Sequence, residues 1–441
     1  MQSTNVHYGN ATQARALSPP ESRLMRRVAL ASLVGTLIEF YDFGIYGFAA
    51  ALVFGKVFFP ALGTAAGTVA AFATFGVAFV ARPIGAIAFG HFGDRLGRKK
   101  TLVLTLLMMG LSTVLVGLMP TSAQVGVVAP ILLITLRVVQ GLAAGGEWAG
   151  AVLFAAESAP QEQRGFWSMF ASLGAGIAVS LAPATFLLSG LFMSDQAFLS
   201  WGWRIPFLTS LVLLAVGLWI RLAMEETPVF KAAMESGRVV KIPFAEAFRR
   251  QYREILLAGG MMILTFCFGY LGVAYLTNYG TAVLKFPRTL VLSISVIGGL
   301  VYTVGILGSG ILSDKIGRRK VVLGATSIGV LWSLALFPLL DVGTGTAFAV
   351  GVLTTMFIAG TALGPMSAFV SELFDTRYRY TAVGFSYNIA GVVGGAITPL
   401  LAASVTAAYG GPAFGLLLSG LAMISFICVL CLRETRGQKL N

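Results

Sequence analysis

The stretch GHFGDRLGRKK, from Gly90 to Lys100, returns as GILSDKIGRRK from Gly310 to Lys320 in a chain of 441 residues. Both copies place glycines, an aspartate and a run of basic residues in the same order, and both lie between long apolar segments. Short charged hairpins of this kind join membrane helices, and internal repeats are how many secondary transporters are built. The repeat therefore predicts a membrane protein made of two equivalent halves.

The composition supports a membrane location, because 57% of the residues are hydrophobic, only 11% are charged and the mean hydropathy is +0.85. A soluble domain could not bury that much apolar surface. Because a helix needs about 20 apolar residues to cross a bilayer, we expect an all-α membrane protein with twelve transmembrane helices in two six-helix pseudo-symmetric bundles. The expected spans are 27–54, 66–91, 101–119, 125–156, 166–191, 203–223, 255–282, 289–312, 321–340, 345–371, 380–408 and 412–432.

One polar insertion divides the chain into these halves. It mixes charges with Pro228, Gly237 and Pro243, which is typical of a connector rather than of a span. We therefore expect five regions along the chain: a cytoplasmic tail over 1–24, a first bundle over 25–223, a cytoplasmic linker over 224–254, a second bundle over 255–432 and a cytoplasmic tail over 433–441.

The basic residues indicate the orientation, since cytoplasmic loops retain Lys and Arg. Of the 31 basic residues, only Lys56, Arg204, Lys285 and Arg288 fall in the loops opposite the termini. We therefore predict a multi-pass protein of the bacterial cytoplasmic membrane with both termini in the cytoplasm. This orientation also explains the net charge of +13, so no nucleic-acid partner is expected.

The cysteines and histidines give no sign of a cofactor. Cys267, Cys428 and Cys431 all lie in expected spans, and His7 and His91 are too far apart in the chain to suggest a metal cluster. Packing explains the two nearby cysteines better than redox chemistry does. With no paired nucleophile and base in a soluble domain either, we expect no metal, no cofactor and no enzyme activity.

Five ionisable residues lie inside expected spans, where the orientation does not explain them: Glu39, Asp42, Arg82, Arg137 and Glu147. Charges at this depth are costly, so they normally face a water-filled cavity or one another. Helical spacing places Tyr46 on the face of Glu39 and Asp42, and Gln140 on the same arc as Glu147. The alternative is a static salt-bridge network that only holds helices together.

These charges suggest how a solute could be carried with a proton. Desolvation favours the neutral form of a carboxylate and a nearby guanidinium favours its charged form, so Glu39, Asp42 or Glu147 could exchange a proton as a cavity opens to alternate sides. Arg137, with Arg82, could bind a substrate carboxylate. Gln140 and Tyr46 are further candidates for substrate contacts. In the second half, Tyr387 and Asn388 are the best candidates, whereas Tyr275, Asn278 and Tyr279, near a helix end, are equally typical of an interfacial belt.

A second set of charges predicts a gate at the cytoplasmic surface. Glu157 precedes Arg164 by seven residues, and Glu372 precedes Arg379 by the same spacing. Together with both hairpins, these charges could hold one conformation closed; the alternative is that they only set the orientation. The hairpin residues assigned to this gate are Gly90, Asp94, Arg95, Gly97 and Arg98 in the first copy, and Asp314, Lys315, Gly317 and Arg318 in the second.

The hairpin resembles the GxxxDRxGR signature of the major facilitator superfamily. IEFYDFGIYG at Ile38–Gly47, LRVVQGLAAGGEWAGA at Leu136–Ala151 and WGWRIPF at Trp201–Phe207 resemble more narrowly its metabolite:proton symporter branch, which includes permeases for shikimate, α-ketoglutarate and proline or betaine. RVVQG at Arg137–Gly141 matches a helix-4 motif of proton-linked carriers, which favours Arg137 in proton transfer or substrate capture without choosing between them.

The resemblance implies a proton-coupled symporter that takes up a small carboxylate or zwitterion by alternating access, working as a monomer. The alternatives are a proton-coupled antiporter that exports drugs or metabolites, and a sensor that transports nothing. Residues 171–185 lack the helix-5 pattern of the drug antiporters, which counts against export. The sequence leaves open the substrate, the choice between protons and sodium ions, and the acid that carries the proton.

Overall fold

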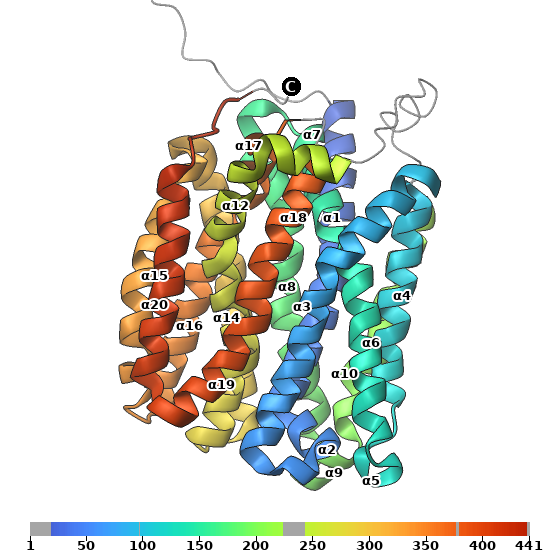
Figure 1. Ribbon diagram of the computed structural model, residues 1–441, viewed down its shortest axis with the longest axis vertical. Coiled ribbons are helices and arrows are strands. Elements are labelled where there is room, and N and C mark those ends of the chain that lie inside the picture. Colours follow the sequence, from blue (N-terminus) through green and yellow to red (C-terminus); the bar gives the residue numbers. More distant parts are fainter. Residues whose placement is uncertain (1–18, 97, 224–242, 376–378, 439–441) are drawn as a thin grey trace, which may run out of the picture.

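The computed structural model describes residues 19–96, 98–223, 243–375 and 379–438, which form helices and short connections with no strand (Figure 1). Within these ranges, 12 helical segments are long and apolar enough to cross a membrane. Each overlaps one of the expected spans, which confirms an all-α protein with twelve membrane-spanning helices.

The first six spans are formed, in chain order, by α1 (Pro19–Ala49) with η1 (Ala50–Phe54) and α2 (Gly55–Phe58); η2 (Pro60–Leu62) with α3 (Gly63–Leu96); α4 (Arg98–Leu118); α6 (Val128–Ala144) with α7 (Glu147–Ser158); α8 (Arg164–Leu191); and α10 (Ile205–Ala223). The connections hold short helices: α5 (Ser122–Val125), η3 (Gln161–Gln163), α9 (Asp195–Ser200) and η4 (Gly202–Arg204).

The last six spans are formed by α12 (Pro243–Tyr270) with η5 (Leu271–Tyr275), α13 (Leu276–Asn278) and η6 (Tyr279–Val283); α14 (Arg288–Ile316); α15 (Arg318–Leu340); α16 (Gly345–Leu363) with α17 (Met366–Leu373); α18 (Arg379–Ala390) with η7 (Gly391–Ile397) and α19 (Thr398–Tyr409); and α20 (Gly411–Cys431). Helix α12 starts inside the expected linker and bends at Gln251, whose backbone is not helical. The rest of that linker, residues 224–242, lies outside the described residues.

Two ends of the molecule can be told apart. The hairpin end holds both repeated hairpins, the first turn of α1 and the last turn of α20, and it is at the top of Figure 1. The opposite end holds α2, α5 and α9, at the bottom of the same view. The two bundles meet along α8 and α14, and along α3 and η7.

Glycines let corresponding helices of each half cross closely. A Cβ on Gly141 of α6 would lie 2.2 Å from the Ala78 carbonyl oxygen of α3, and a Cβ on Gly360 of α16 would lie 2.2 Å from that of Tyr302 on α14. Small residues permit such backbone contact between membrane helices. Spans two and four of the first half therefore pack as spans eight and ten of the second do, as expected for repeated bundles.

Candidate functional site

A buried ion pair lies where the two bundles meet. Nη2 of Arg82 on α3 lies 3.0 Å from Oε1 of Glu39 on α1, and the two side chains are 1% and 0% exposed. Aromatic rings surround the guanidinium, whose carbon lies 4.0 Å from the ring centre of Phe43 and 5.9 Å from that of Tyr387 on α18. The two charges thus face each other among aromatic rings contributed by both halves.

Several polar atoms around this pair have no hydrogen-bond partner in the described structure. They are Oε2 of Glu39, Nε and Nη1 of Arg82, and the hydroxyls of Tyr270 and Tyr387. Tyr270, on α12, packs against Phe79 at 4.9 Å between ring centres. Because buried polar groups nearly always have partners, this cluster of free donors and acceptors is where a polar ligand would gain most.

The second buried arginine has a different environment. Nη1 of Arg137 donates to Gln140, which donates to Thr113, whose hydroxyl contacts Oδ2 of Asp42 at 2.8 Å. Nη2 of Arg137 donates to the Phe75 carbonyl at 3.1 Å, and its guanidinium carbon lies 3.8 Å from the centre of the Tyr46 ring. The Tyr46 hydroxyl itself donates to Thr74. Arg137 and Asp42 are therefore linked through side chains of the first half alone.

The third acid is held in yet another way. Glu147, the first residue of α7, forms an ion pair with Arg221 of α10, which also donates to the Leu102 carbonyl on α4. Sequence reasoning assigned Arg221 only to the cytoplasmic surface and so missed this partner. The three candidate acids thus have three environments: Glu39 pairs with Arg82 beside rings of both halves, Asp42 accepts from the Thr113 hydroxyl, and Glu147 pairs with Arg221.

The two candidates from the second half lie close to the central pair, Glu39 with Arg82. Tyr387 and Asn388 are 3% and 1% exposed. The Tyr387 ring packs on Phe266 at 4.8 Å and on Trp148 of α7 at 4.0 Å between centres. The amide of Asn388 donates to the Gly145 carbonyl of the first half at 3.0 Å, while its Oδ1 has no partner in the described structure.

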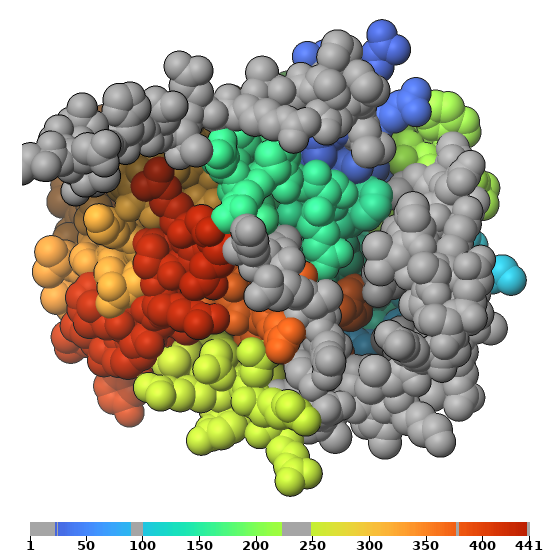
Figure 2. Space-filling model, turned by 90° about the horizontal axis from the view of Figure 1, so that it is seen from above, coloured from blue at the N-terminus to red at the C-terminus, as the bar shows by residue number. Residues whose placement is uncertain are grey.

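Figure 2 shows the molecule from the hairpin end, where ion pairs cross between the halves. Arg164 contacts Glu372 at 2.9 Å, and Arg379 contacts Glu157 at 3.2 Å. Each acid thus pairs with the arginine of the other half rather than with the arginine that follows it by seven residues in its own half. The four residues that repeat in sequence are joined into two cross-links in space.

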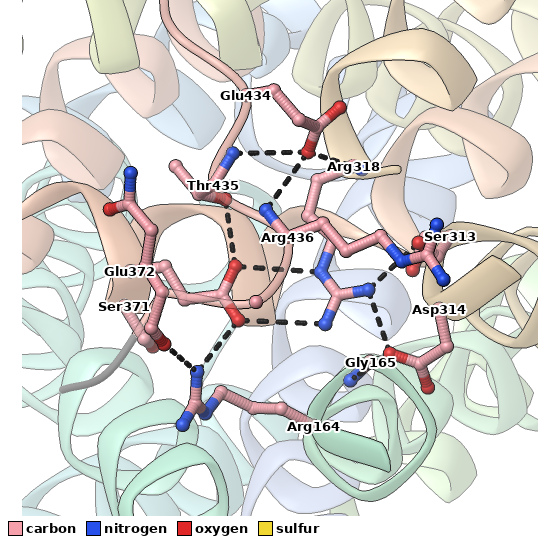
Figure 3. A network of polar contacts seen from close by, with 12 residues as sticks. Arg164, Gly165, Ser313, Asp314, Arg318, Ser371, Glu372, Glu434, Thr435 and Arg436 are labelled. Carbon is pink, nitrogen blue, oxygen red and sulfur yellow. Dashed lines mark hydrogen bonds and ion pairs between the residues drawn. The ribbon is translucent and has the colours of Figure 1, made fainter. Parts of the chain in front are cut away.

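The second hairpin strengthens this closure (Figure 3). The carboxylate of Asp314 accepts from the backbone N–H groups of Gly165 and Phe166, at 3.0 and 2.8 Å, in the first turn of α8. Carboxylates are stabilised at helix N-termini. Arg318 bonds both Asp314, at 2.7 Å, and Glu372, at 3.4 Å, while Lys315 is exposed. The corresponding Gly90, Asp94, Arg95, Gly97 and Arg98 of the first hairpin lie outside the described residues or side chains.

The end of the chain is a part of this network that sequence reasoning missed. Glu434 accepts from the backbone N–H groups of Arg318 and Arg319, and Thr435 donates to Glu372 at 2.7 Å. Gly317, with φ of 107°, leaves no room there for a side chain. Beyond these residues, the Gln438 carbonyl accepts from Arg164 of the first half at 3.1 Å. The carboxyl-terminal segment therefore joins both halves.

The opposite end is more open. A cavity of about 550 Å³ lies between the halves there and is lined by residues that include Lys56, Thr68, Asn278 and Arg288. At this end, among the described residues, the halves are joined by one ion pair, Arg288 with Asp195 at 3.2 Å, and by one hydrogen bond, from Asn278 to the Ala51 carbonyl. Glu39 and Arg82 do not line this cavity, and because both side chains are almost fully buried the pair is enclosed in this conformation.

Comparison with known proteins places the chain in a family. The family model described as Major Facilitator Superfamily matches residues 32–399. The chain belongs to the Major Facilitator Superfamily. It is 42% identical over 428 residues to the inner membrane metabolite transport protein YhjE of Escherichia coli (strain K12), an alignment that covers 96% of this chain and 97% of the relative.

Other superfamily members with printed substrates are also similar. The shikimate transporter of Escherichia coli (strain K12) is 40% identical, over 88% of this chain and 89% of the relative. The proline/betaine transporter of Salmonella typhimurium is 33% identical, over 95% of this chain and 85% of the relative. These relatives match the branch that the sequence motifs indicated.

A solved structure confirms the fold. The proton:xylose symporter XylE, bound to 6-bromo-6-deoxy-D-glucose, superposes with a TM-score of 0.75 over 95% of this chain and 98% of its own, at 16% identity. The protein is thus a multi-pass membrane protein for secondary transport of small metabolites, and its relatives are transporters rather than enzymes.

Proposed function

We propose that this protein is a proton-coupled symporter that takes up a small carboxylate or zwitterion across the bacterial cytoplasmic membrane by alternating access. The names of the shikimate and proline/betaine transporters support that substrate class, because shikimate, proline and betaine each carry a carboxylate. The hairpin end, where α1 begins and α20 ends, faces the cytoplasm in this proposal, since it carries most of the basic residues, and we place both termini in the cytoplasm for the same reason. We also retain the monomer as the working unit.

One observation carries the coupling mechanism: the pair of Glu39 and Arg82 is buried between the halves, and Nε and Nη1 of Arg82 are left without partners. In the empty carrier, Arg82 neutralises Glu39. A substrate carboxylate that binds the free side of the guanidinium competes with Glu39 for its charge, and Glu39 then becomes neutral by taking up a proton. Substrate and proton would therefore be carried together.

This mechanism assigns different tasks to the two buried arginines. Arg82 contacts rings of both halves, so it is the cation we propose for substrate capture. Arg137 is bonded to Gln140 and to the Phe75 carbonyl, so we assign it to holding Asp42 in place through Gln140 and Thr113. Asp42 and Glu147 remain the alternative proton carriers.

The contacts at the hairpin end support a gate. The cross-links of Arg164 with Glu372 and of Arg379 with Glu157, together with Asp314 on the N-terminus of α8, must break for the halves to separate there. We propose that these contacts hold the cytoplasmic side closed while the cavity at the opposite end admits substrate. Their release would open the path inward.

Uptake by proteoliposomes tests the proposal. A thermal-shift screen of purified protein against shikimate, α-ketoglutarate, proline and glycine betaine first selects a radiolabelled solute. With an inward proton gradient we expect wild-type protein to accumulate that solute. Glu39→Gln should lose gradient-driven accumulation but keep exchange of labelled for unlabelled solute, because exchange needs no net proton movement. Asp375→Asn, which removes an exposed carboxylate instead, is the matched control and should keep both activities.

The outcomes separate the alternatives. Accumulation by Glu39→Gln at the wild-type level would refute the role of Glu39 and leave Asp42 and Glu147 to be tested. Expulsion of solute under the same gradient would identify an antiporter. Accumulation that follows a sodium gradient would show that sodium, rather than the proton, is the coupling ion. Failure of all four solutes to move would refute the substrate class.

A further inference from the structure

The paired glycines of LAAGGEW break the fourth span near the central pair. Helix α6 ends at Ala144 and α7 begins at Glu147, so Gly145 and Gly146 lie between the two helices. Gly145 packs so closely on α3 that a Cβ would lie 2.2 Å from the Arg82 carbonyl oxygen. A break in a helix leaves backbone carbonyls without helical partners, and inside a membrane these need other donors.

Side chains of the second half supply those donors. Asn388 donates to the Gly145 carbonyl at 3.0 Å, and the Tyr380 hydroxyl donates to the Gly146 carbonyl at 2.7 Å. Both side chains lie on α18. The rings of Trp148 on α7 and Tyr387 on α18 stack with centres 4.0 Å apart and planes 13° apart. The broken helix of one half is therefore attached to one helix of the other half.

The stack connects two regions already described. Tyr387 also lies beside Arg82, whose guanidinium carbon is 5.9 Å from the centre of the Tyr387 ring, and the buried Tyr387 hydroxyl makes no hydrogen bond of normal geometry. On α7, Trp148 precedes Glu157, and on α18, Tyr387 follows Arg379. Glu157 and Arg379 are the residues that pair at the hairpin end. The same two helices thus join at the substrate site through rings and at the hairpin end through charges.

We propose that Trp148 is a positioning residue: by stacking on Tyr387 it closes the path on the cytoplasmic side of Arg82 and keeps the Tyr387 hydroxyl facing the substrate site. The inference rests on the proposed function for its direction of transport. Substrate that bonds the hydroxyl would pull on the ring that forms the closure. Binding at Arg82 would in this way be communicated to α7 and α18.

Distances between the halves test this closure without substrate or a proton gradient. Spin labels on Glu162→Cys and Asp375→Cys, both exposed at the hairpin end, report separation of the halves there, in a background where Cys428 and Cys431 are serine. We expect Trp148→Ala to raise the population with long distances about two- to tenfold, the factor that loss of an aromatic pair implies. Trp148→Phe, which keeps a ring, should restore most of the closed population.

Two further variants separate positioning from packing. Trp203→Ala removes an equally buried tryptophan that packs on Phe54, Phe58 and Phe207 inside the first half, so it should lower thermal stability without changing the distances. Tyr387→Ala should open the hairpin end as Trp148→Ala does, and the double variant should add little to either.

The proposal is overturned if Trp148→Ala and Trp203→Ala change the distances alike, if Trp148→Phe gives no rescue, or if the Trp148 and Tyr387 effects add independently. Because the distance measurement needs no solute, a negative result would refute the closure by Trp148 but not the proposed transport function. A negative uptake assay would refute the transport function but not the closure. The two hypotheses can therefore be rejected separately.

Discussion

The two halves share a scaffold but differ in their chemistry. Each has a charged hairpin, the same close glycine crossing of its second and fourth helices, and an acid and an arginine spaced seven apart. At the centre, however, the first half contributes the ion pair of Glu39 and Arg82, whereas the second half faces it with the hydroxyls of Tyr270 and Tyr387. The repeat has preserved the scaffold, whereas the buried charges that we propose for proton coupling lie in the first half alone.

Removing one charge of the central pair should have the largest effect. Arg82→Gln leaves Glu39 buried without a cation, which costs about 3–5 kcal/mol of stability when a buried pair is broken. We expect a marked fall in thermal stability and no uptake. Adding Glu39→Gln should restore much of the stability, because no unpaired charge remains, but no gradient-driven uptake.

Thermal unfolding of the single and double variants, followed by uptake, checks this prediction. Glu434→Gln serves as a control that removes a partly buried acid at the hairpin end instead of the fully buried Glu39. Equal stability of Arg82→Gln and the double variant would mean that Glu39 does not depend on Arg82 for its charge. The contrast between the halves would then lose its electrostatic basis.

The cross-links between the halves should have the next largest effect. In spin-label distances, Arg164→Gln and Glu372→Gln should each raise the open population, and the double variant should fall short of their sum by about 0.5–3 kcal/mol, as for directly interacting residues. Arg164→Gln with Glu157→Gln should instead be additive within about 0.5 kcal/mol. If Arg164 coupled to Glu157 of its own half rather than to Glu372 of the other half, the pairing across the halves would be contradicted.

Much of the architecture could be read from the sequence because it depends on periodicity and length. The hairpin repeat predicted two bundles, and apolar runs predicted every span that the described residues contain. The cost of charge in a membrane was enough to single out Glu39 and Arg82 as residues that require a partner. These signals are local to one helix and need no knowledge of its neighbours.

Pairing between helices was harder to predict, because helical spacing gives the face of a residue but not the helix it meets. Glu147 meets Arg221, a residue that the orientation rule had already explained, and Glu157 meets Arg379 of the other half. Trp148 gave no signal at all, since an apolar ring in a membrane helix is ordinary. Partners that lie far apart in the chain become visible only when the helices are packed.

The smallest predicted effect concerns the uncharged half. The Tyr270 hydroxyl is buried without a partner, so Tyr270→Phe should not lower the thermal stability. If that hydroxyl bonds the substrate, its loss should raise KM about two- to tenfold and leave the maximal uptake rate unchanged, since one hydrogen bond contributes about 0.5–1.5 kcal/mol. Tyr275→Phe is the matched control, because its hydroxyl already contacts Thr406 away from the central pair. An unchanged KM in Tyr270→Phe, or an equal rise in both variants, would remove Tyr270 from the site and leave Tyr387 and Asn388 as the second-half candidates for substrate recognition.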